Sequence, residues 1–253
     1  MSLVSYDVSG PVARVTLNRP DNLNAVNAEL TRGVGSAFGR AVADPAVRVV
    51  VLDAEGRAFC AGADLKDPNT HSGDDLLAHL EPAEGGGLEA VAACPKPVVV
   101  AAQGWCVGAG VELVLSADIA VVAEDARFFL PQVALGIVPG AGGMSRLLRK
   151  VGPTWAHRLV MLGEKVPAEV ALRIGLVSEI VPRDALAQRA AEIAETLAAA
   201  PPAAQRLAKE SLLQAADLPL AAALRVDQYR LFMLSDTAEK KERHAAFAAE
   251  RSA

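Results

Sequence analysis

One short stretch of the chain combines the residue types that acid–base chemistry beside a bound oxygen would need. It begins with the apolar run Val98–Ala102, which predicts a strand buried on both faces. Gly104, Gly108 and Gly110 follow, and such small residues let the backbone approach a ligand closely. One carboxylate, Glu112, lies in the next apolar run, where a charge is costly unless it is solvated, paired or used.

A helix that starts near Gly108 would complete this arrangement. The first backbone N–H groups of a helix have no partner inside it, so they can bind an anionic oxygen in the preceding turn. Glu112 would lie in the first turn of that helix, within reach of the same ligand. Donors for a developing negative oxygen, next to an acid or base, suit reactions that pass through an enolate.

Hydrophobic periodicity predicts the strands and helices on either side of this stretch. Segments 3–8 and 12–17 alternate apolar and polar residues around Ser9-Gly10, which predicts a hairpin. A turn leads into a predicted helix over 28–43, whose Leu30, Val34, Phe38 and Ala41 share one face. Further strands are expected at 48–53, 119–122, 127–130 and 176–181, and further helices at 143–151, 153–163 and 167–174.

Two other regions have a character of their own. Residues 66–90 show no clear periodicity and contain glycine runs, so we expect a lid or an entrance there. From Arg183 onward, four helical patterns rich in Ala and Leu run to the C-terminus. This tail is too apolar to stand free, so we expect it to pack on the core or on another subunit.

The order of the elements predicts a wound α/β core. No GxGxxG follows the first strand, as a nucleotide-binding fold would require.

Composition excludes several classes of function. The 253 residues carry a net charge of −5, which argues against a nucleic-acid partner. No apolar run is long enough to span a membrane and no secretory signal is evident, so we expect a cytoplasmic protein. Cys60, Cys94 and Cys106 lack the spacing of a zinc site and are odd in number, so neither a metal site nor a disulfide framework is predicted.

Four motifs, each present once, follow one another in order along essentially the whole chain. They are Asn18-Arg19-Pro20 with Asn24-Ala25, then 59–65 (FCAGADL), 104–113 (GWCVGAGVEL) and 135–143 (LGIVPGAGG). In order and spacing they resemble the crotonase (enoyl-CoA hydratase/isomerase) superfamily. The resemblance implies a spiral of ββα units over residues 1–195 and a C-terminal helical region over 196–253 that builds a trimer or a hexamer. It also implies an acyl-CoA thioester substrate, with coenzyme A entering as part of the substrate and no separate cofactor.

The resemblance also assigns roles to single residues. The backbone N–H groups of Ala63 and Ala109 would form an oxyanion hole for the thioester oxygen, and both residues lie beside glycine, where the backbone can reach a carbonyl. Glu112 matches the first of the two catalytic glutamates of hydratases. The positions expected to line the substrate are Ala25, Ala61, Gly62, Asp64, Gly108 and Gly110.

The second catalytic glutamate has no match. Family hydratases carry Pro-Glu where this chain has Pro131-Gln132, twenty positions after Glu112. The amide of Gln132 can orient a water or an acyl group, but it cannot exchange a proton near neutral pH. Three hypotheses therefore stay open: hydration of a 2-enoyl-CoA in fatty-acid or related acyl-CoA breakdown, a single-base isomerisation or other enolate reaction, and acyl-CoA binding without catalysis. The retained Glu112 favours an enzyme, with hydration placed first.

Overall fold

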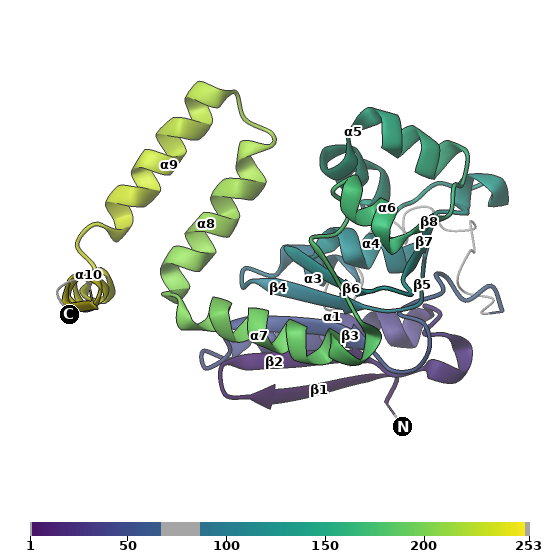
Figure 1. Cartoon of the computed structure of the whole chain (residues 1–253), viewed down its shortest axis with the longest axis horizontal. Helices are drawn as coiled ribbons and strands as arrows, with labels where there is room; N and C mark the ends of the chain where they lie inside the picture. The colour runs from purple at the N-terminus through teal and green to yellow at the C-terminus, as the bar shows by residue number, and fades with distance from the viewer. Residues whose placement is uncertain (1, 67–86, 251–253) are drawn as a thin grey trace.

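The core of the molecule is built on a six-stranded sheet with the order β1-β2-β3-β4-β6-β9 (Figure 1). The computed structural model describes residues 2–66 and 87–250, so the lid predicted over 66–90 falls almost entirely outside the described residues. The strands are β1 (Val4–Ser9), β2 (Val12–Leu17), β3 (Val49–Ala54), β4 (Val98–Ala102), β6 (Ile119–Ala123) and β9 (Glu179–Val181). β1 and β2 form the predicted antiparallel hairpin, and the other pairs are parallel.

Both faces of this sheet are buried, because its central strands alternate their side chains between two apolar clusters. In β3, Val50 and Leu52 join the larger cluster, while Val49 and Val51 join a smaller one on the opposite face. Every residue of β4 is buried, as a parallel strand covered by helices on both sides should be. The core is made mostly of Val, Leu and Ala with few aromatic rings, in a chain that is 52% hydrophobic but only 4% aromatic.

A second, three-stranded sheet holds the segment that follows β4. Its order is β5 (Trp105–Val107), β7 (Arg127–Phe129) and β8 (Val166–Pro167), and two of these strands, β5 and β8, were not predicted. Both are only two or three residues long, and so short a segment carries no periodic pattern. The two sheets together with their helices confirm the predicted α/β class.

Helices cover the two sheets. They are α1 (Ala28–Ala43), α3 (Glu89–Ala93), α4 (Ala109–Ser116), α5 (Gly143–Met161) and α6 (Ala168–Arg173), with short 3-10 turns η1 (Pro20–Asn22), η3 (Gln132–Leu135) and η4 (Arg183–Ala185). α1 buries the predicted face, including Leu30 and Phe38. α5 bends where Gly152 leaves the helical conformation (φ 72°) before Pro153, which matches the two helices predicted there.

The last four helices confirm the four helical patterns of the sequence. α7 (Leu186–Ala199) packs across the sheet, while α8 (Pro202–Ala215) and α9 (Leu220–Leu234) form an antiparallel pair that extends away from the core, with α10 (Ala238–Glu250) at its end (Figure 1). The division expected at 195/196 stays a prediction, and α7 runs across that position. In the described part of the chain, no helix is both long and apolar enough to cross a membrane.

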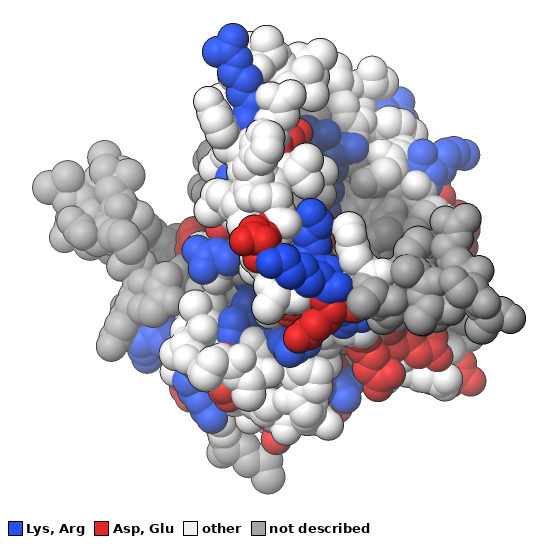
Figure 2. Space-filling view, turned by 90° about the vertical axis from the view of Figure 1, so that its left-hand side faces the viewer, with Lys and Arg blue, Asp and Glu red and all other residues white. Residues whose placement is uncertain are grey.

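The arm formed by α8 and α9 exposes many large apolar side chains. They are Leu212, Leu213, Leu220, Leu224, Leu231, Phe232 and Met233. Figure 2 views the side of the molecule on which the arm lies and shows uncharged surface interspersed with patches of both signs. Lys209 holds α8 to the core, because its ammonium group lies 2.7 Å from Asp118 and donates to the Lys96 carbonyl.

Candidate functional site

Three segments far apart in the sequence meet around one cavity of about 590 Å³. They are the loop that follows β3, the turn between β5 and α4, and the stretch after β7. The residues that line it are Ala61, Gly62, Ala63, Leu65, Val107, Gly108, Ala109, Glu112, Pro131, Gln132, Leu135, Ile137, Val138 and Gly140. All four residues that the sequence predicted to be catalytic (Ala63, Ala109, Glu112 and Gln132) are among them.

Backbone hydrogen bonds hold the first two segments together. The Cys60 N–H donates to the Trp105 carbonyl at 3.1 Å, and the Val107 N–H donates to the Cys60 carbonyl at 2.8 Å. Gly110 permits this close approach, because a Cβ atom there would lie 2.5 Å from the Cys60 carbonyl oxygen. Gly110 therefore does not line the cavity; it allows α4 to pack against the segment that carries Ala63.

The backbone N–H groups of Ala63 and Ala109, both of which line the cavity, have no acceptor among the described residues. Ala109 is the first residue of α4, where an N–H has no partner within the helix. Ala63 lies between two hydrogen-bonded neighbours, since Gly62 accepts from the Val26 N–H and Asp64 donates to the Val26 carbonyl. Both groups are therefore free to donate to a ligand in the cavity.

Glu112 is 5% exposed and is held by a loop that precedes α5. One of its carboxylate oxygens, Oε1, accepts from the Ala141 N–H at 2.8 Å and from the Gly143 N–H at 3.0 Å. Gly143 is also the first residue of α5, and the N-terminal end of a helix carries a partial positive charge that favours a carboxylate. The other oxygen, Oε2, accepts no hydrogen bond from the described residues.

Burial raises the pKa of Glu112 above its ordinary value. The two backbone N–H donors and the nearby Arg146 act in the opposite direction, because they stabilise the ionised form. The net effect raises the pKa of the carboxyl group toward neutral pH. A side chain with such a pKa can both accept and return a proton. An acid or base with a raised pKa in a cavity is a common feature of active sites.

Gln132 begins η3 and is 8% exposed. Its side-chain oxygen, Oε1, has no hydrogen-bond partner in the described residues although it is buried. The amide nitrogen lies against Gly108, because a Cβ atom there would be 3.2 Å from Nε2. A buried acceptor without a donor is costly, so this atom is suited to bind a water or a ligand group.

Besides Gly110, two other predicted substrate-lining residues, Ala25 and Asp64, lie outside the cavity lining. Asp64 forms an ion pair with Arg19 at 2.7 Å, and that hydrogen bond lowers the pKa of the Asp64 carboxyl group. The same guanidinium donates to the Ala25 carbonyl at 2.9 Å. Ala25 and Asp64 are therefore joined through Arg19 next to the site, while Ala61, Gly62 and Gly108 line the cavity as expected.

The sequence did not predict the donors that hold Glu112. They lie 29 and 31 residues further along the chain, in a glycine-rich loop that was interpreted as a family motif and as the start of a helix, without a contact to Glu112. Gly143 offers no side chain there, and a Cβ atom at that position would lie 2.7 Å from Oε1 of Glu112. The combination of a glycine run with a buried carboxylate was the available signal.

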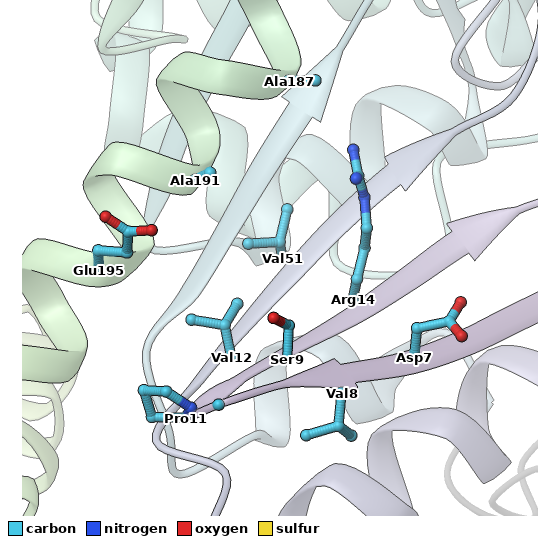
Figure 3. A pocket seen from close by; sticks show the side chains of 11 residues that line it. Asp7, Val8, Ser9, Pro11, Val12, Arg14, Val51, Ala187, Ala191 and Glu195 are labelled. Atoms are coloured by element: carbon cyan, nitrogen blue, oxygen red, sulfur yellow. The ribbon is translucent and has the colours of Figure 1, made fainter.

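A second cavity, of about 630 Å³, lies between the β1–β2 hairpin and α7 (Figure 3). Val12 and Val51 lie beside α7, and the charged side chains there are those of Asp7, Arg14 and Glu195. None of the four sequence motifs contributes to its lining. The arrangement suited to enolate chemistry is therefore found at the Glu112 cavity.

Comparison with known proteins agrees with the fold and with the motifs at this site. The family model described as "Enoyl-CoA hydratase/isomerase" matches residues 7–253. The chain is 39% identical to a probable enoyl-CoA hydratase of Rhizobium meliloti, over 98% of this chain and 95% of the relative. It is 36% identical to the 2,3-dehydroadipyl-CoA hydratase of Escherichia coli, over 95% of this chain and 93% of the relative.

Solved structures give the same result for the fold. An enoyl-CoA hydratase from Bacillus anthracis superposes with a TM-score of 0.92 at 32% identity, covering 98% of this chain and 96% of the other. This likeness confirms the predicted crotonase fold with its C-terminal helical region. The chain belongs to the enoyl-CoA hydratase/isomerase family.

Proposed function

We propose that this protein hydrates the double bond of a 2-enoyl-CoA. The observation that carries the proposal is that one cavity is lined by Ala63 and Ala109, whose backbone N–H groups are free, and by the buried carboxyl group of Glu112. The names of the relatives support the same reaction class, since several are enoyl-CoA hydratases. Coenzyme A would enter as part of the substrate.

The chemistry follows from the two kinds of group. The N–H groups of Ala63 and Ala109 donate to the thioester oxygen, which becomes negative when the oxygen of a water molecule forms a bond to Cβ. Glu112 accepts a proton from that water. The electrons of the double bond move onto the thioester to form the enolate, and Glu112 then returns the proton to Cα. The product is a 3-hydroxyacyl-CoA, and atoms and charge balance without a second carboxylate.

Gln132 occupies the position of the second glutamate, and in this scheme it orients the water without exchanging a proton. Its unpartnered Oε1 accepts a hydrogen bond from the attacking water and so holds the water beside Glu112. The apolar side chains of Leu65, Leu135 and Ile137 in the cavity favour an uncharged acyl group.

A single-base isomerisation is the second candidate, and Gln132 is the observation that favours it. A reaction in which Glu112 moves a proton between two carbons of the acyl chain needs no second acid and no bound water. Both reactions would use the same oxyanion hole. They differ in product, because isomerisation of a 3-enoyl-CoA creates a conjugated thioester and hydration removes one.

The exposed apolar arm supports a further part of the proposal, that the protein assembles as a trimer or a hexamer. Side chains such as Leu220, Phe232 and Met233 are more than two-thirds exposed in a single chain, a surface that another subunit would cover. Light scattering at micromolar concentration should give three or six times the mass of one chain, and a monomer would contradict the assembly.

The three cysteines are unpaired and buried, which fits the cytoplasm, a reducing compartment.

The function is tested by the absorbance of the conjugated thioester. Crotonyl-CoA and longer 2-enoyl-CoAs should lose this absorbance when incubated with the protein, and the Glu112→Gln variant should be inactive as the matched control. A gain of absorbance from a 3-enoyl-CoA, without loss from any 2-enoyl-CoA, would establish the isomerase instead. Binding of acyl-CoA with neither change would leave a non-catalytic protein.

A further inference from the structure

We propose that Arg146 is a positioning residue for this reaction, whose guanidinium holds the loop before α5 so that two backbone N–H groups stay directed at one oxygen of Glu112. The proposal rests on the proposed function in so far as Glu112 is the base. It assigns a role to a side chain that is absent from the lining of the cavity. Arg146 therefore acts through the loop and does not touch the substrate.

A chain of three hydrogen-bonded groups connects Arg146 to the carboxylate. Nη1 of Arg146 donates to the Ala141 carbonyl at 2.8 Å. The N–H of the same residue, Ala141, donates to Oε1 of Glu112 at 2.8 Å. A displacement of the Ala141 backbone would therefore break both contacts at once.

The residue between the two donors shows how closely the guanidinium packs on the loop. Gly142 has a left-handed backbone conformation (φ 81°), and a Cβ atom there would overlap the Arg146 guanidinium. The Arg146 N–H also donates to the Gly142 carbonyl at 2.9 Å, within the first turn of α5. The loop is thus fixed by the backbone and by the side chain of one residue, which defines the direction of the Ala141 and Gly143 N–H groups.

Holding the carboxylate by one oxygen has a consequence for the reaction. Oε1 is occupied by two donors, so Oε2 is the atom available to exchange a proton with water or with Cα. If the loop moved, Glu112 could rotate and the proton-accepting atom would lose its place. A misplacement of about 1 Å in such a site can lower the rate by about 100-fold. The positive charge of Arg146 also helps to lower the pKa of Glu112, against the effects of burial and of the Glu89 carboxylate on α3, which raise it.

Two substitutions separate the charge of Arg146 from its hydrogen bond, and a third provides the control. Arg146→Met keeps a long side chain but removes the donors and the charge, whereas Arg146→Lys keeps the charge without the planar fork. Arg149→Met makes the same change on the same helix, at an exposed residue that pairs with Asp217 and not with the loop. For each protein, kcat, KM, the melting temperature and the pH profile of kcat are measured.

We expect Arg146→Met to lower kcat by about 10- to 100-fold with little change in KM. Its rate should also fall off at a higher pH on the acidic side, because loss of a neighbouring cation raises the pKa of a carboxyl group. Arg146→Lys should restore the acidic side of the profile and only part of kcat, and Arg149→Met should match the unmodified protein. If Arg146→Met behaved like Arg149→Met, or lowered the melting temperature alone, the proposal would be wrong.

Two further results keep the test decisive. Should Arg146→Met fail to fold, Arg146→Lys decides alone: a lower kcat at unchanged KM supports the proposal, and an unchanged kcat overturns it. Should the unmodified protein show no turnover, the proposed function fails, and the Arg146 proposal is then tested by ¹³C NMR of the Glu112 carboxyl group. In that titration, with Glu112→Gln assigning the signal, a higher pKa in a folded Arg146 variant that lacks the charge supports it and an unchanged pKa overturns it.

Discussion

Gly143 is the position at which a single methyl group should disturb the catalytic carboxylate most directly. In Gly143→Ala, the new Cβ atom would lie 2.7 Å from Oε1 of Glu112, 2.9 Å from its Cγ and 2.6 Å from Cβ of Pro139. Real Cβ atoms do not approach other atoms so closely, so either the Glu112 side chain or the loop must move. Movement of either one lengthens the hydrogen bonds from the Ala141 and Gly143 N–H groups.

The size of the effect follows from those two bonds. A hydrogen bond to a charged group contributes about 1.5–3 kcal/mol, so loss of one should lower the rate by roughly 10- to 150-fold. Because the bonds stabilise the ionised carboxylate, their loss should also raise the pKa of Glu112 further. The acidic side of the pH–rate profile should therefore move to higher pH.

The assay is the pH dependence of kcat on a 2-enoyl-CoA, with Gly39→Ala as the matched control. Gly39 is exposed on α1, and a Cβ atom there would meet nothing within 4 Å, so the same change should leave kcat unaltered. We expect the two variants to differ by at least tenfold in kcat. Equal activity and equal pH profiles would show that the loop before α5 does not set the position and the pKa of Glu112.

Two further predictions concern the carboxylate and its neighbour. Glu112→Gln should abolish turnover and raise the melting temperature at neutral pH, because burial raises the pKa of Glu112 and the folded state then disfavours its charge. Calorimetry should show this gain in melting temperature shrinking as the pH falls through the raised pKa of Glu112 toward the ordinary value of 4.5. A gain that grew in acid would contradict a raised pKa for Glu112. Gln132→Glu should increase hydration of a 2-enoyl-CoA, since help from a general acid is worth about 10²–10⁴-fold. A lower native activity with no gain in hydration would instead indicate a reaction fitted to one base.

Local patterns of the sequence predicted most of the core. The β1–β2 hairpin, α1 and the buried strand β4 follow from periodicities of two and 3.6 residues, because each buries a continuous face. The meeting of Ala63, Ala109 and Glu112 was predicted from the family motifs, and the structure brings them to one cavity. Their roles in the reaction stay a prediction.

What the sequence did not reveal depends on contacts between distant segments. The strand β5 is three residues long and is recognisable only through its partners, Cys60 on one side and β7 on the other. The support of Glu112 by Ala141 and Gly143 comes from backbone N–H groups, which every residue except proline carries, so the glycine run is its only trace in the sequence. The role of Arg146 likewise becomes visible only when its contact with the loop is known.

The proposed hydration depends on the Ala109 N–H, which stabilises a negative oxygen, and Ala109→Pro removes this single donor. Proline lacks the N–H group but is well tolerated at the first position of a helix, which Ala109 occupies in α4. The measurement is kcat on a 2-enoyl-CoA, together with the melting temperature. We predict a fall of about 10²–10³-fold, the usual effect of losing one oxyanion-hole donor, in a protein that still folds. Unimpaired turnover in the folded variant would show that the Ala109 N–H is not an oxyanion donor.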